Sequence, residues 1–386
     1  MRMKLLYIAN VDLGDKRSGI TRKVFSQYNV FAANFDAFLI GYDGRNIRII
    51  NGQESNNINT EGRKPSAVLR EEALNTSKSN EINAFYIRRM EVTISVLSFL
   101  KRLKDKNGVL LWEIPTYPYD FENKSFLNPV QKVRAKLRLR MDSILRNNLK
   151  KYVDHIVTFS HVDDIFGIKT IVTGNGVDVD QIRPRKIADH GDEIHMIAVA
   201  VMRPWHAYDR LIKGIKDYYD QGGTRNIIFH VVGDGSILTD YKNLVESYKL
   251  STHVIFYGAR TKDEIDEIYD KADIAVESLG WHRSKVPMGT SIKTREYVAK
   301  GLPIIASSPM DIFPEGWEYA YYAPIDESNI NIQEIIDFYD HLISKKSKEA
   351  LADEIREIAY KRCDMKIMMQ QIIDYYNDTQ PTNNNK

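Results

Sequence analysis

The sequence predicts an α/β protein in which two doubly wound, Rossmann-like domains follow one another and face each other across a cleft. Three observations predict this fold class. The chain has 386 residues, enough for two separate cores. Apolar, strand-like runs alternate with helical patterns, and this alternation occurs twice along the chain. The runs are apolar throughout, which is typical of parallel strands that helices cover on both faces.

The first domain is predicted at residues 1–182 and the second at residues 183–365. A polar segment with proline and glycine, 183–192, is the expected linker. Residues 366–386 are expected to form a C-terminal helix, a candidate to cross back to the first domain, and a frayed polar tail.

The elements of the first domain follow from its apolar runs, and the polar stretch 51–83 is expected to be an excursion without regular structure. Strands are expected at 4–9, 37–41, 109–112, 156–160 and 170–172, with helices at 19–33, 88–104 and 129–151. In the second domain, strands are expected at 196–201, 227–232, 254–257, 274–276 and 303–306, with helices at 208–219, 237–248, 262–272, 291–300, 330–342 and 348–376.

The composition is that of a globular protein, with 43% hydrophobic and 27% charged residues. The single cysteine, Cys363, excludes an internal disulfide framework and suits a reducing cytoplasm. The N-terminal apolar run is too short for a signal peptide, and no run reaches the roughly 18 residues that a spanning helix needs. We therefore expect a cytoplasmic protein, either free or at the inner face of the membrane. The net charge of +2 indicates no nucleic-acid partner.

The segment 289–305 carries the first functional signal. A glycine turn and two helix-capping side chains lead into a helix, whose free N–H groups and positive dipole end suit a diphosphate. Glu296 lies one turn further in, where a carboxylate can hold two ribose hydroxyls. Taken alone, the segment is equally well an ordinary capped helix between two strands. The candidate donor-binding residues of this segment are Gly289, Thr290, Ser291, Ile292, Lys293 and Glu296.

Four segments, ordered and spaced alike, resemble the family-four glycosyltransferases: 171–184, 229–235, 257–260 and 295–305. The resemblance implies the GT-B fold, a nucleotide-sugar donor bound by the second domain, and transfer with retention of configuration and without a metal. It adds four residues to the donor-binding candidates, Gly233, Gly235, Gly258 and Arg260.

Two positions depart from the family pattern. In the family, an Arg and a Lys after the first strand of the second domain meet the donor diphosphate. Arg203 falls at the Arg, but His206 falls at the Lys, and a neutral imidazole carries no permanent charge. The family also has a Glu eight positions before Glu296, where this chain has Met288, so a contact to the transferred sugar is in question. The catalytic candidates are Arg203, His206 and Glu296.

Other charged residues allow alternatives. Arg283 and Lys285 either meet the donor or are solvated loop charges. Asp178 and Asp180 look like a metal-binding pair, but they lie inside the junction segment, so we predict no metal there. One cysteine and unsuitable histidine spacing argue against a structural zinc site. No cofactor is expected, since the nucleotide-sugar, UDP- or GDP-linked, is a co-substrate.

The acceptor-side candidates lie in the first domain. Ser18 and Gly19 follow the first strand, where the family has a glycine-rich loop, although a lone glycine there is also a common turn. Glu113, Tyr117 and Tyr119 follow another strand in a stiff loop with two prolines. This loop either stacks on a sugar ring or is a rigid loop with a buried tyrosine.

The helix at 132–151 is strongly basic, with Asp142 as its one acidic residue. On a helical wheel, an apolar face of Val133, Leu137, Met141 and Ile144 lies beside a basic face. The helix is either a solvated helix packed on its own sheet or a peripheral contact to an anionic membrane.

These observations predict a glycosyltransferase that moves a sugar from a nucleotide-sugar to a glycan or lipid-linked acceptor in surface polysaccharide synthesis. A nucleotide-sugar epimerase of the same fold would need an acid–base set around the sugar, which the sequence does not offer. A non-catalytic nucleotide-binding module is the alternative outside the enzymes.

Overall fold

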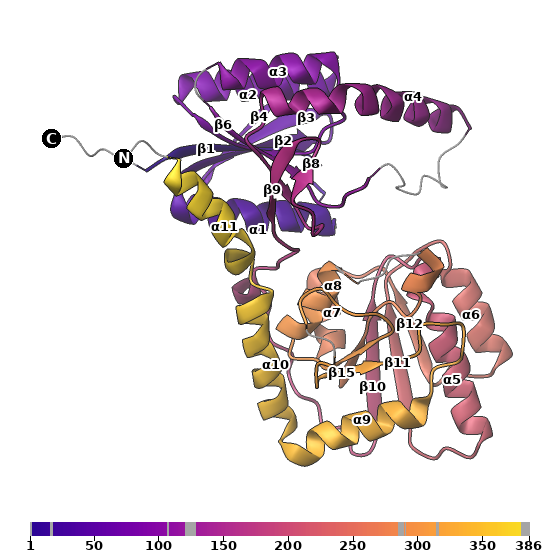
Figure 1. Ribbon diagram of the computed structural model, residues 1–386. Coiled ribbons are helices and arrows are strands. Elements are labelled where there is room, and N and C mark those ends of the chain that lie inside the picture. The colour runs from indigo at the N-terminus through magenta and orange to yellow at the C-terminus, as the bar shows by residue number, and fades with distance from the viewer. Residues whose placement is uncertain are drawn as a thin grey trace. The chain divides into compact units, whose positions relative to one another are not determined.

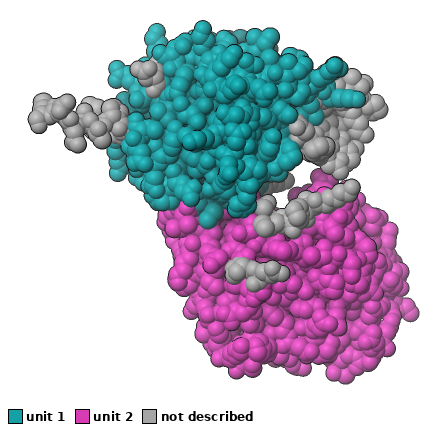
Figure 2. Space-filling model, viewed as in Figure 1, with its two compact units in different colours: residues 1–174, 368–386 teal, residues 175–367 magenta. Residues whose placement is uncertain are grey.

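Two mainly parallel sheets, one in each half of the chain, organise the protein (Figure 1). The computed structural model describes residues 2–15, 18–105, 108–119, 129–284, 289, 291–313 and 316–379, with only the backbone described for 129–135. The chain divides into two compact units (Figure 2). Unit 1 comprises residues 1–174 and 368–386, and unit 2 comprises residues 175–367.

The sheet of unit 1 has the strand order β4-β3-β2-β1-β5-β6-β7-β9-β8 in the described residues. Its centre is parallel because β1 pairs in parallel with both β2 and β5, and β1 is buried from Leu5 to Ala9. The strands are β1 (Lys4–Asp12), β2 (Asp36–Asp43), β3 (Asn46–Asn51), β4 (Glu54–Ile58), β5 (Ala84–Arg88), β6 (Val109–Ile114), β7 (His155–Thr158), β8 (Asp164–Ile165) and β9 (Ile168–Val172).

Helices cover both faces of this sheet, with α2 and α3 on one face and α1 and α11 (Met365–Asp378) on the other (Figure 1). Apolar faces of these helices complete the core, such as Val96, Leu100 and Leu103 of α3. The helices of unit 1 are α1 (Gly19–Asn34), α2 (Pro65–Ser79), α3 (Ile94–Lys104), α4 (Pro129–Leu145) and the 3₁₀ turn η1 (Arg146–Lys151).

The stretch 51–83 corrects the sequence prediction, because it is structured. It carries the strand β4, which pairs antiparallel with the preceding β3, and the helix α2. The sequence hid α2 because few apolar residues, Val68, Leu69 and Ala73, bury its inner face. The helix predicted at 88–104 also begins later, at Ile94, because the preceding apolar run is the buried strand β5.

The sheet of unit 2 is parallel throughout, with the order β12-β11-β10-β13-β14-β15. Its strands are β10 (Ile194–Val199), β11 (Ile227–Val232), β12 (Val254–Gly258), β13 (Ile274–Val276), β14 (Ile304–Ala306) and β15 (Ala320–Tyr322), the last not predicted. Its helices are η3 (Pro204–His206), α5 (Tyr208–Asp220), α6 (Leu238–Ser247), α7 (Lys262–Tyr269), η4 (Trp281–Ser284), α8 (Ile292–Ala299), α9 (Ile332–Lys345) and α10 (Lys348–Arg362), besides the turn η2 (Val179–Gln181).

The long C-terminal helix predicted at 348–376 is two helices, α10 and α11 (Met365–Asp378). They separate at Cys363 and Asp364, where the backbone turns to bond Val177: Val177 N–H donates to Cys363 O (2.9 Å) and Met365 N–H donates to Val177 O (2.8 Å). From Met368 onward the chain groups with unit 1, where the Tyr376 hydroxyl donates to Phe85 O (2.8 Å). Residues 175–182, which the sequence assigned to the first domain, group with unit 2.

Candidate active site

The order of strands in unit 2 reverses between β10 and β13. From β10 the chain moves outward to β11 and β12, then returns to β13 and continues to β14 and β15 on the other side. Open α/β sheets bind their ligands at such a reversal, so the carboxyl ends of β10 and β13, with the loops that follow them, form the expected binding crevice.

Backbone hydrogen bonds join these two loops. Leu279 N–H donates to His206 O (2.9 Å), and Gly280 N–H donates to Trp205 O (3.1 Å). The first loop carries Arg203 and the second leads towards α8. The candidate residues of both loops are thereby held at one place in the fold.

His206 is buried and uncharged. Its Nδ1 accepts a hydrogen bond from the Arg203 N–H (2.9 Å), so the ring proton is on Nε2. Burial and the nearby Lys293 ammonium lower the pKa of His206 to about 2, although the bond from Arg203 opposes this shift. The imidazole is therefore a neutral hydrogen-bond donor at physiological pH and a fixed part of the loop.

Lys293 brings a permanent positive charge to the same place. Its ammonium lies 3.0 Å from Glu277 Oε2 and donates to Ser278 Oγ (3.1 Å) and to the Tyr208 hydroxyl (3.2 Å). Lys293 lies in the first turn of α8, where the helix dipole disfavours a cation. Since Glu277 is almost fully buried, this pair is a charged group built into the crevice.

The N-terminus of α8 is capped by Ser291. The Ser291 Oγ accepts from Thr294 N–H (3.3 Å) and donates to Glu277 Oε1 (2.8 Å). Glu277 thus orients both the helix cap and the lysine. Sequence reasoning missed Glu277, although a carboxylate directly after the apolar strand β13 was a usable signal.

The remaining candidate residues of this region differ in burial and in their contacts. Gly289 pairs with Met310 beside the loop that leads to α8, and its N–H donates to Pro309 O (2.9 Å). Ile292 and Glu296 are half-buried on α8. Arg203 is half-exposed, and no hydrogen bond or ion pair of its guanidinium is found among the described residues. Thr290, with Lys285 and Met288, lies outside the described residues.

Gly233 and Gly235 are required by the backbone itself. A Cβ on Gly233 would lie 1.9 Å from Ala200 O, and one on Gly235 would lie 2.2 Å from Met202 O. Both residues also have positive φ, 121° and 152°. Their missing side chains let the loop after β11 lie against the loop after β10, so they shape the crevice wall.

Gly258 ends β12 and Arg260 follows it, two strands away from the reversal. Gly258 has positive φ, and its carbonyl accepts from Gly233 N–H (2.8 Å). The Arg260 side chain is exposed, and its Nη1 donates to the neighbouring Ala259 O (3.2 Å). Neither residue belongs to the hydrogen-bonded pair of loops.

Arg283 is not a free loop charge. Its guanidinium binds the carboxylates of Asp209 (2.9 Å) and Glu327, and donates to Pro204 O (3.1 Å). These two carboxylates raise its pKa. Arg283 therefore clamps the loop after β13 onto the start of α5, so the expectation of a free, solvated loop charge is wrong, while a contact to the donor stays a prediction.

Glu113 was expected to contact the acceptor, but it is a buried structural ion. It is fully buried on β6 and is bound by Lys23 (3.3 Å), Gln27 (3.3 Å), Tyr86 (3.0 Å) and Arg88 (2.8 Å). Burial alone would raise its pKa, but the Lys23 and Arg88 charges outweigh it and lower the pKa to about 2. With its oxygens bound from inside unit 1, Glu113 does not reach an acceptor.

Tyr119 is also buried, and its hydroxyl donates to Asp142 Oδ2 (2.7 Å). Its ring lies under the Arg89 guanidinium, 3.5 Å from the ring centroid. The expectation of a sugar-stacking ring is therefore wrong for Tyr119. Tyr117 is half-buried, packs edge-on against Phe166 and bonds Ser160 through its backbone.

Ser18 and Gly19 start α1, after the central strand β1. The Ser18 side chain accepts from Thr21 N–H (3.4 Å) as the helix cap, and both residues are half-exposed. They are the acceptor-side candidates that remain accessible, together with Tyr117.

The helix α4 extends beyond the sheet of unit 1 (Figure 1), and three apolar side chains of its described part are exposed. Leu137, Met141 and Ile144 are 60%, 48% and 67% exposed. The opposite side is fixed by Asp142, which is buried and accepts from Val92 N–H (2.7 Å) and the Tyr119 hydroxyl. Asp142 thus anchors α4 on unit 1, while both alternatives for the helix, a solvated helix or a membrane contact, stay predictions.

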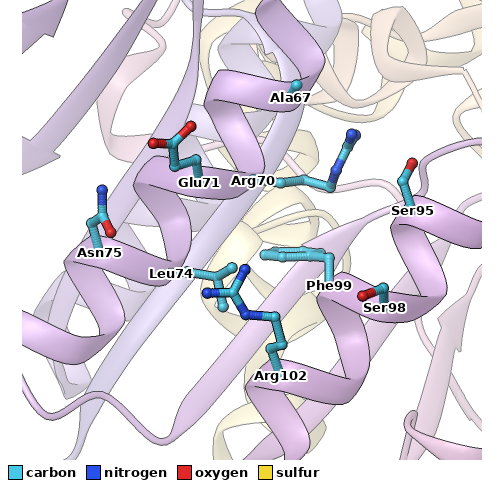
Figure 3. A pocket seen from close by; sticks show the side chains of 9 residues that line it. All are labelled: Ala67, Arg70, Glu71, Leu74, Asn75, Ser95, Ser98, Phe99 and Arg102. Carbon is cyan, nitrogen blue, oxygen red and sulfur yellow. The ribbon is translucent and has the colours of Figure 1, made fainter.

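A pocket of about 440 Å³ lies elsewhere in unit 1, between α2 and α3 (Figure 3). None of the predicted site residues lines it. Its one aromatic ring, Phe99, is otherwise part of the core of unit 1. The residues that line it are Ala67, Arg70, Glu71, Leu74, Asn75, Ser95, Ser98, Phe99 and Arg102.

A family model identifies the unit that holds the crevice. Residues 179–362 match the model described as glycosyl transferases group 1. Unit 2 is a group 1 glycosyltransferase domain. The chain is accordingly a glycosyltransferase, which confirms the enzyme class and the family resemblance predicted from the sequence. No curated protein sequence matches the chain.

Solved structures match this glycosyltransferase along nearly its whole length. HepE of Anabaena in complex with UDP is 14% identical with a TM-score of 0.59, over 98% of this chain and all of that one. A glycosyltransferase from Rickettsia africae is 13% identical (TM-score 0.64, 98% of each chain), and sucrose-phosphate synthase from Thermosynechococcus elongatus is 13% identical (TM-score 0.62, 98% and 99%). At this identity the structures show the fold, and the predicted GT-B class is confirmed.

None of the helices in the described part of the chain has the length and hydropathy that crossing a bilayer requires.

Proposed function

We propose that this glycosyltransferase moves a hexose from a UDP- or GDP-linked sugar to a glycan or lipid-linked acceptor in surface polysaccharide synthesis, with retention and without a metal. The observation that carries the proposal is the crevice at the strand reversal of unit 2, where Arg203, Lys293 and the N-terminus of α8 come together. Two cations and free helix N–H groups are a binding site for a diphosphate.

Lys293 takes the role of the lysine that position 206 lacks. The ammonium of Lys293 is close enough to lower the pKa of His206, so both side chains serve the same place in the crevice. His206 contributes its Nε2–H as a neutral donor. Negative charge grows on the diphosphate as the glycosidic bond breaks, and cations fixed beforehand stabilise it without reorganisation.

Glu296 is proposed to hold the ribose, and Ser18, Gly19 and Tyr117 to contact the acceptor. HepE of Anabaena, with the same fold, was also solved with UDP-glucose. That complex favours a uridine diphosphate hexose as the first donor to test.

The acceptor side is proposed to work at an anionic membrane through α4. The exposed stripe of Leu137, Met141 and Ile144 is flanked by exposed Lys136, Arg138 and Arg140. A helix with this arrangement lies in the plane of the interface, its apolar side chains among the acyl chains and its cations at the headgroups. Such a position suits a lipid-linked acceptor.

A donor screen tests the proposal. Thermal melting with UDP-, GDP- and ADP-hexoses should identify one nucleotide that stabilises the protein, by about 3 kcal/mol at a hundredfold excess over Kd. Glu296→Gln should weaken that stabilisation, since a charge-assisted hydrogen bond contributes roughly 1.5–3 kcal/mol.

With the radiolabelled donor, sugar release should require an acceptor. Epimerisation of the donor in the absence of an acceptor would support a nucleotide-sugar epimerase. Binding without turnover would support a non-catalytic nucleotide-binding module. Stabilisation by none of the nucleotides, or full activity of Glu296→Gln, would contradict the proposed donor site.

A further inference from the structure

A second cluster of polar side chains lies at the opposite edge of the unit 2 sheet, at the start of β10. It contains His190 and Glu193, just before the strand, and His195, its second residue. One possible ligand atom from each of the three lies within 4.8 Å of the others. Because β10 runs from Ile194 to Val199, this cluster lies about 20 Å from the crevice at the other end of the strand.

Each of the three side chains is oriented by a further partner. His190 Nε2 lies 3.0 Å from Lys271 O, and a carbonyl only accepts, so Nδ1 of His190 keeps its lone pair. Glu193 Oε1 accepts from Asn226 Nδ2 (2.7 Å), which fixes the carboxylate.

The partner of His195 is a chain of hydrogen bonds across the sheet. His195 Nδ1 lies 2.9 Å from His230 Nε2, and His230 Nδ1 lies 2.9 Å from the Tyr257 hydroxyl. With all three groups neutral, each donates one hydrogen bond to the next. The Tyr257 hydroxyl donates to His230 Nδ1, His230 Nε2 donates to His195 Nδ1, and His195 Nε2 donates to the Glu193 carboxylate. The hydrogen bonds can also run in the opposite direction, with His195 Nδ1 donating to His230 and His230 Nδ1 donating to Tyr257. His195 Nε2 then has a free lone pair, and the net charge of the three groups is unchanged.

We propose that His190, Glu193 and His195 form a binding site for a divalent transition-metal cation of the zinc type. His195 Nε2 and Glu193 Oε2 are 3.0 Å apart and share one proton, and a cation would take the place of that proton. Two imidazoles and one carboxylate are a ligand set that zinc accepts, with a fourth position left for water. Carbonyl, amide and imidazole partners behind the ligands are the outer shell that metal sites use.

Binding requires a local movement. The rings of His190 and His195 stack with their centroids 3.8 Å apart, so their lone pairs run side by side. His190 lies on the half-exposed loop before β10 and must rotate to aim Nδ1 at the ion. The bound ion would then tie the loop that enters unit 2 to β10, and its role would be structural, because the site is remote from the crevice.

The sequence argued against such a site, because the chain has a single cysteine. The ligands are close in sequence, but His230, Asn226 and Lys271, which orient them, come from other segments. Only the fold shows the site.

The test uses the untagged, chelator-treated full chain, titrated with zinc chloride in a calorimeter. The wild type should bind one zinc ion per chain and melt at a higher temperature with zinc. His190→Ala and Glu193→Gln should each weaken binding by at least roughly tenfold. Cobalt(II) in place of zinc should give the absorption bands of a four-coordinate ion in the wild type and not in these variants.

His341→Ala is the matched control, because His341 is an exposed histidine of the same unit with acidic neighbours in its helix, and it should bind zinc as the wild type does. No saturable zinc binding by the wild type would overturn the proposal. Equal binding by all variants would also overturn it, because the ion would then sit elsewhere. If His190→Ala lowers the melting temperature of the zinc-free protein, its weaker zinc binding could reflect a damaged fold. Glu193→Gln, which keeps the size of the side chain, then decides the test.

Discussion

The ammonium of Lys293 lies 3.0 Å from the carboxylate of Glu277, across the loop that joins β13 to α8. The carboxylate is almost fully buried, and the lysine is only 11% exposed. The pair therefore holds a positive charge in the first turn of α8, with a counter-ion that keeps it there in the absence of a donor.

Lys293→Met should weaken both the fold and donor binding, and a second substitution separates the two effects. The single variant leaves Glu277 as a buried, unpaired charge, at a cost of about 3–5 kcal/mol in the free energy of unfolding. Lys293→Met with Glu277→Gln should recover most of that stability but not the donor affinity. Recovery of both would show that Lys293 acts on the fold alone. Denaturant unfolding and donor titration measure the two quantities.

Arg203→Ala should lower kcat more than it raises KM for the donor. The guanidinium is half-exposed at the crevice, so its removal leaves the core intact, and its charge matters most when the diphosphate leaves. Steady-state kinetics with varied donor measure the two parameters, and Lys242→Ala, which removes an exposed cation of α6, is the control. An unchanged kcat would contradict the phosphate site.

The family pattern by itself predicts that His206→Lys is tolerated or improves donor affinity, whereas the structure predicts a less stable protein. The new ammonium would be buried beside Lys293, and the bond from the Arg203 N–H would be lost. His206→Lys with Lys293→Met should restore a single cation and regain donor binding relative to either single variant. Because the pKa of His206 is about 2, its titration should not appear in the pH–rate profile near neutrality. A double variant no better than its parents would contradict this exchange of roles.

Glu113→Gln should destabilise the protein and remove part of its acid sensitivity. The pKa of Glu113 is lowered from 4.5 to about 2, so its contribution is complete above pH 4.5 and is lost as the pH falls towards 2. The shift corresponds to a contribution on the order of 3 kcal/mol. Between pH 6 and pH 2, the free energy of unfolding should fall less steeply for the variant than for the wild type. Glu71→Gln, at an exposed ion pair, should follow the wild type.

Two sets of substitutions on α4 should separate charge from apolar contact at a membrane. Reversing Lys136, Arg138 and Arg140 should abolish co-sedimentation with anionic vesicles, since each cation contributes about 1 kcal/mol. Added salt should have the same effect. Replacing Leu137, Met141 and Ile144 by serine should weaken binding at every salt concentration. Donor binding in solution should survive both sets. Equal sedimentation with neutral and anionic vesicles would contradict the role of the cations.

The sequence by itself determined the parts of this protein that local patterns encode. Apolar runs predicted most of the parallel strands of both sheets, but not β5 or β15, and the ordered segments from 171 to 305 predicted the glycosyltransferase domain and the GT-B class. The capped start of α8 was visible because a helix cap is a property of adjacent residues. Helix α2 was missed because local polarity concealed its few buried side chains. Strand β5 was missed because its short run, between the polar stretch and the helix predicted at 88–104, was assigned to no element.

Only the tertiary structure decided which side chains meet. Glu113 and Tyr119, predicted to contact the acceptor, are buried in unit 1. The sequence could not show this, because their partners Lys23 and Asp142 come from other helices. The tertiary structure also brought Lys293 to His206 and Glu277, although 87 positions separate Lys293 from the histidine. Charge and burial act through space, and the spacing of residues along a chain carries no information on contacts that the crossing of strands creates.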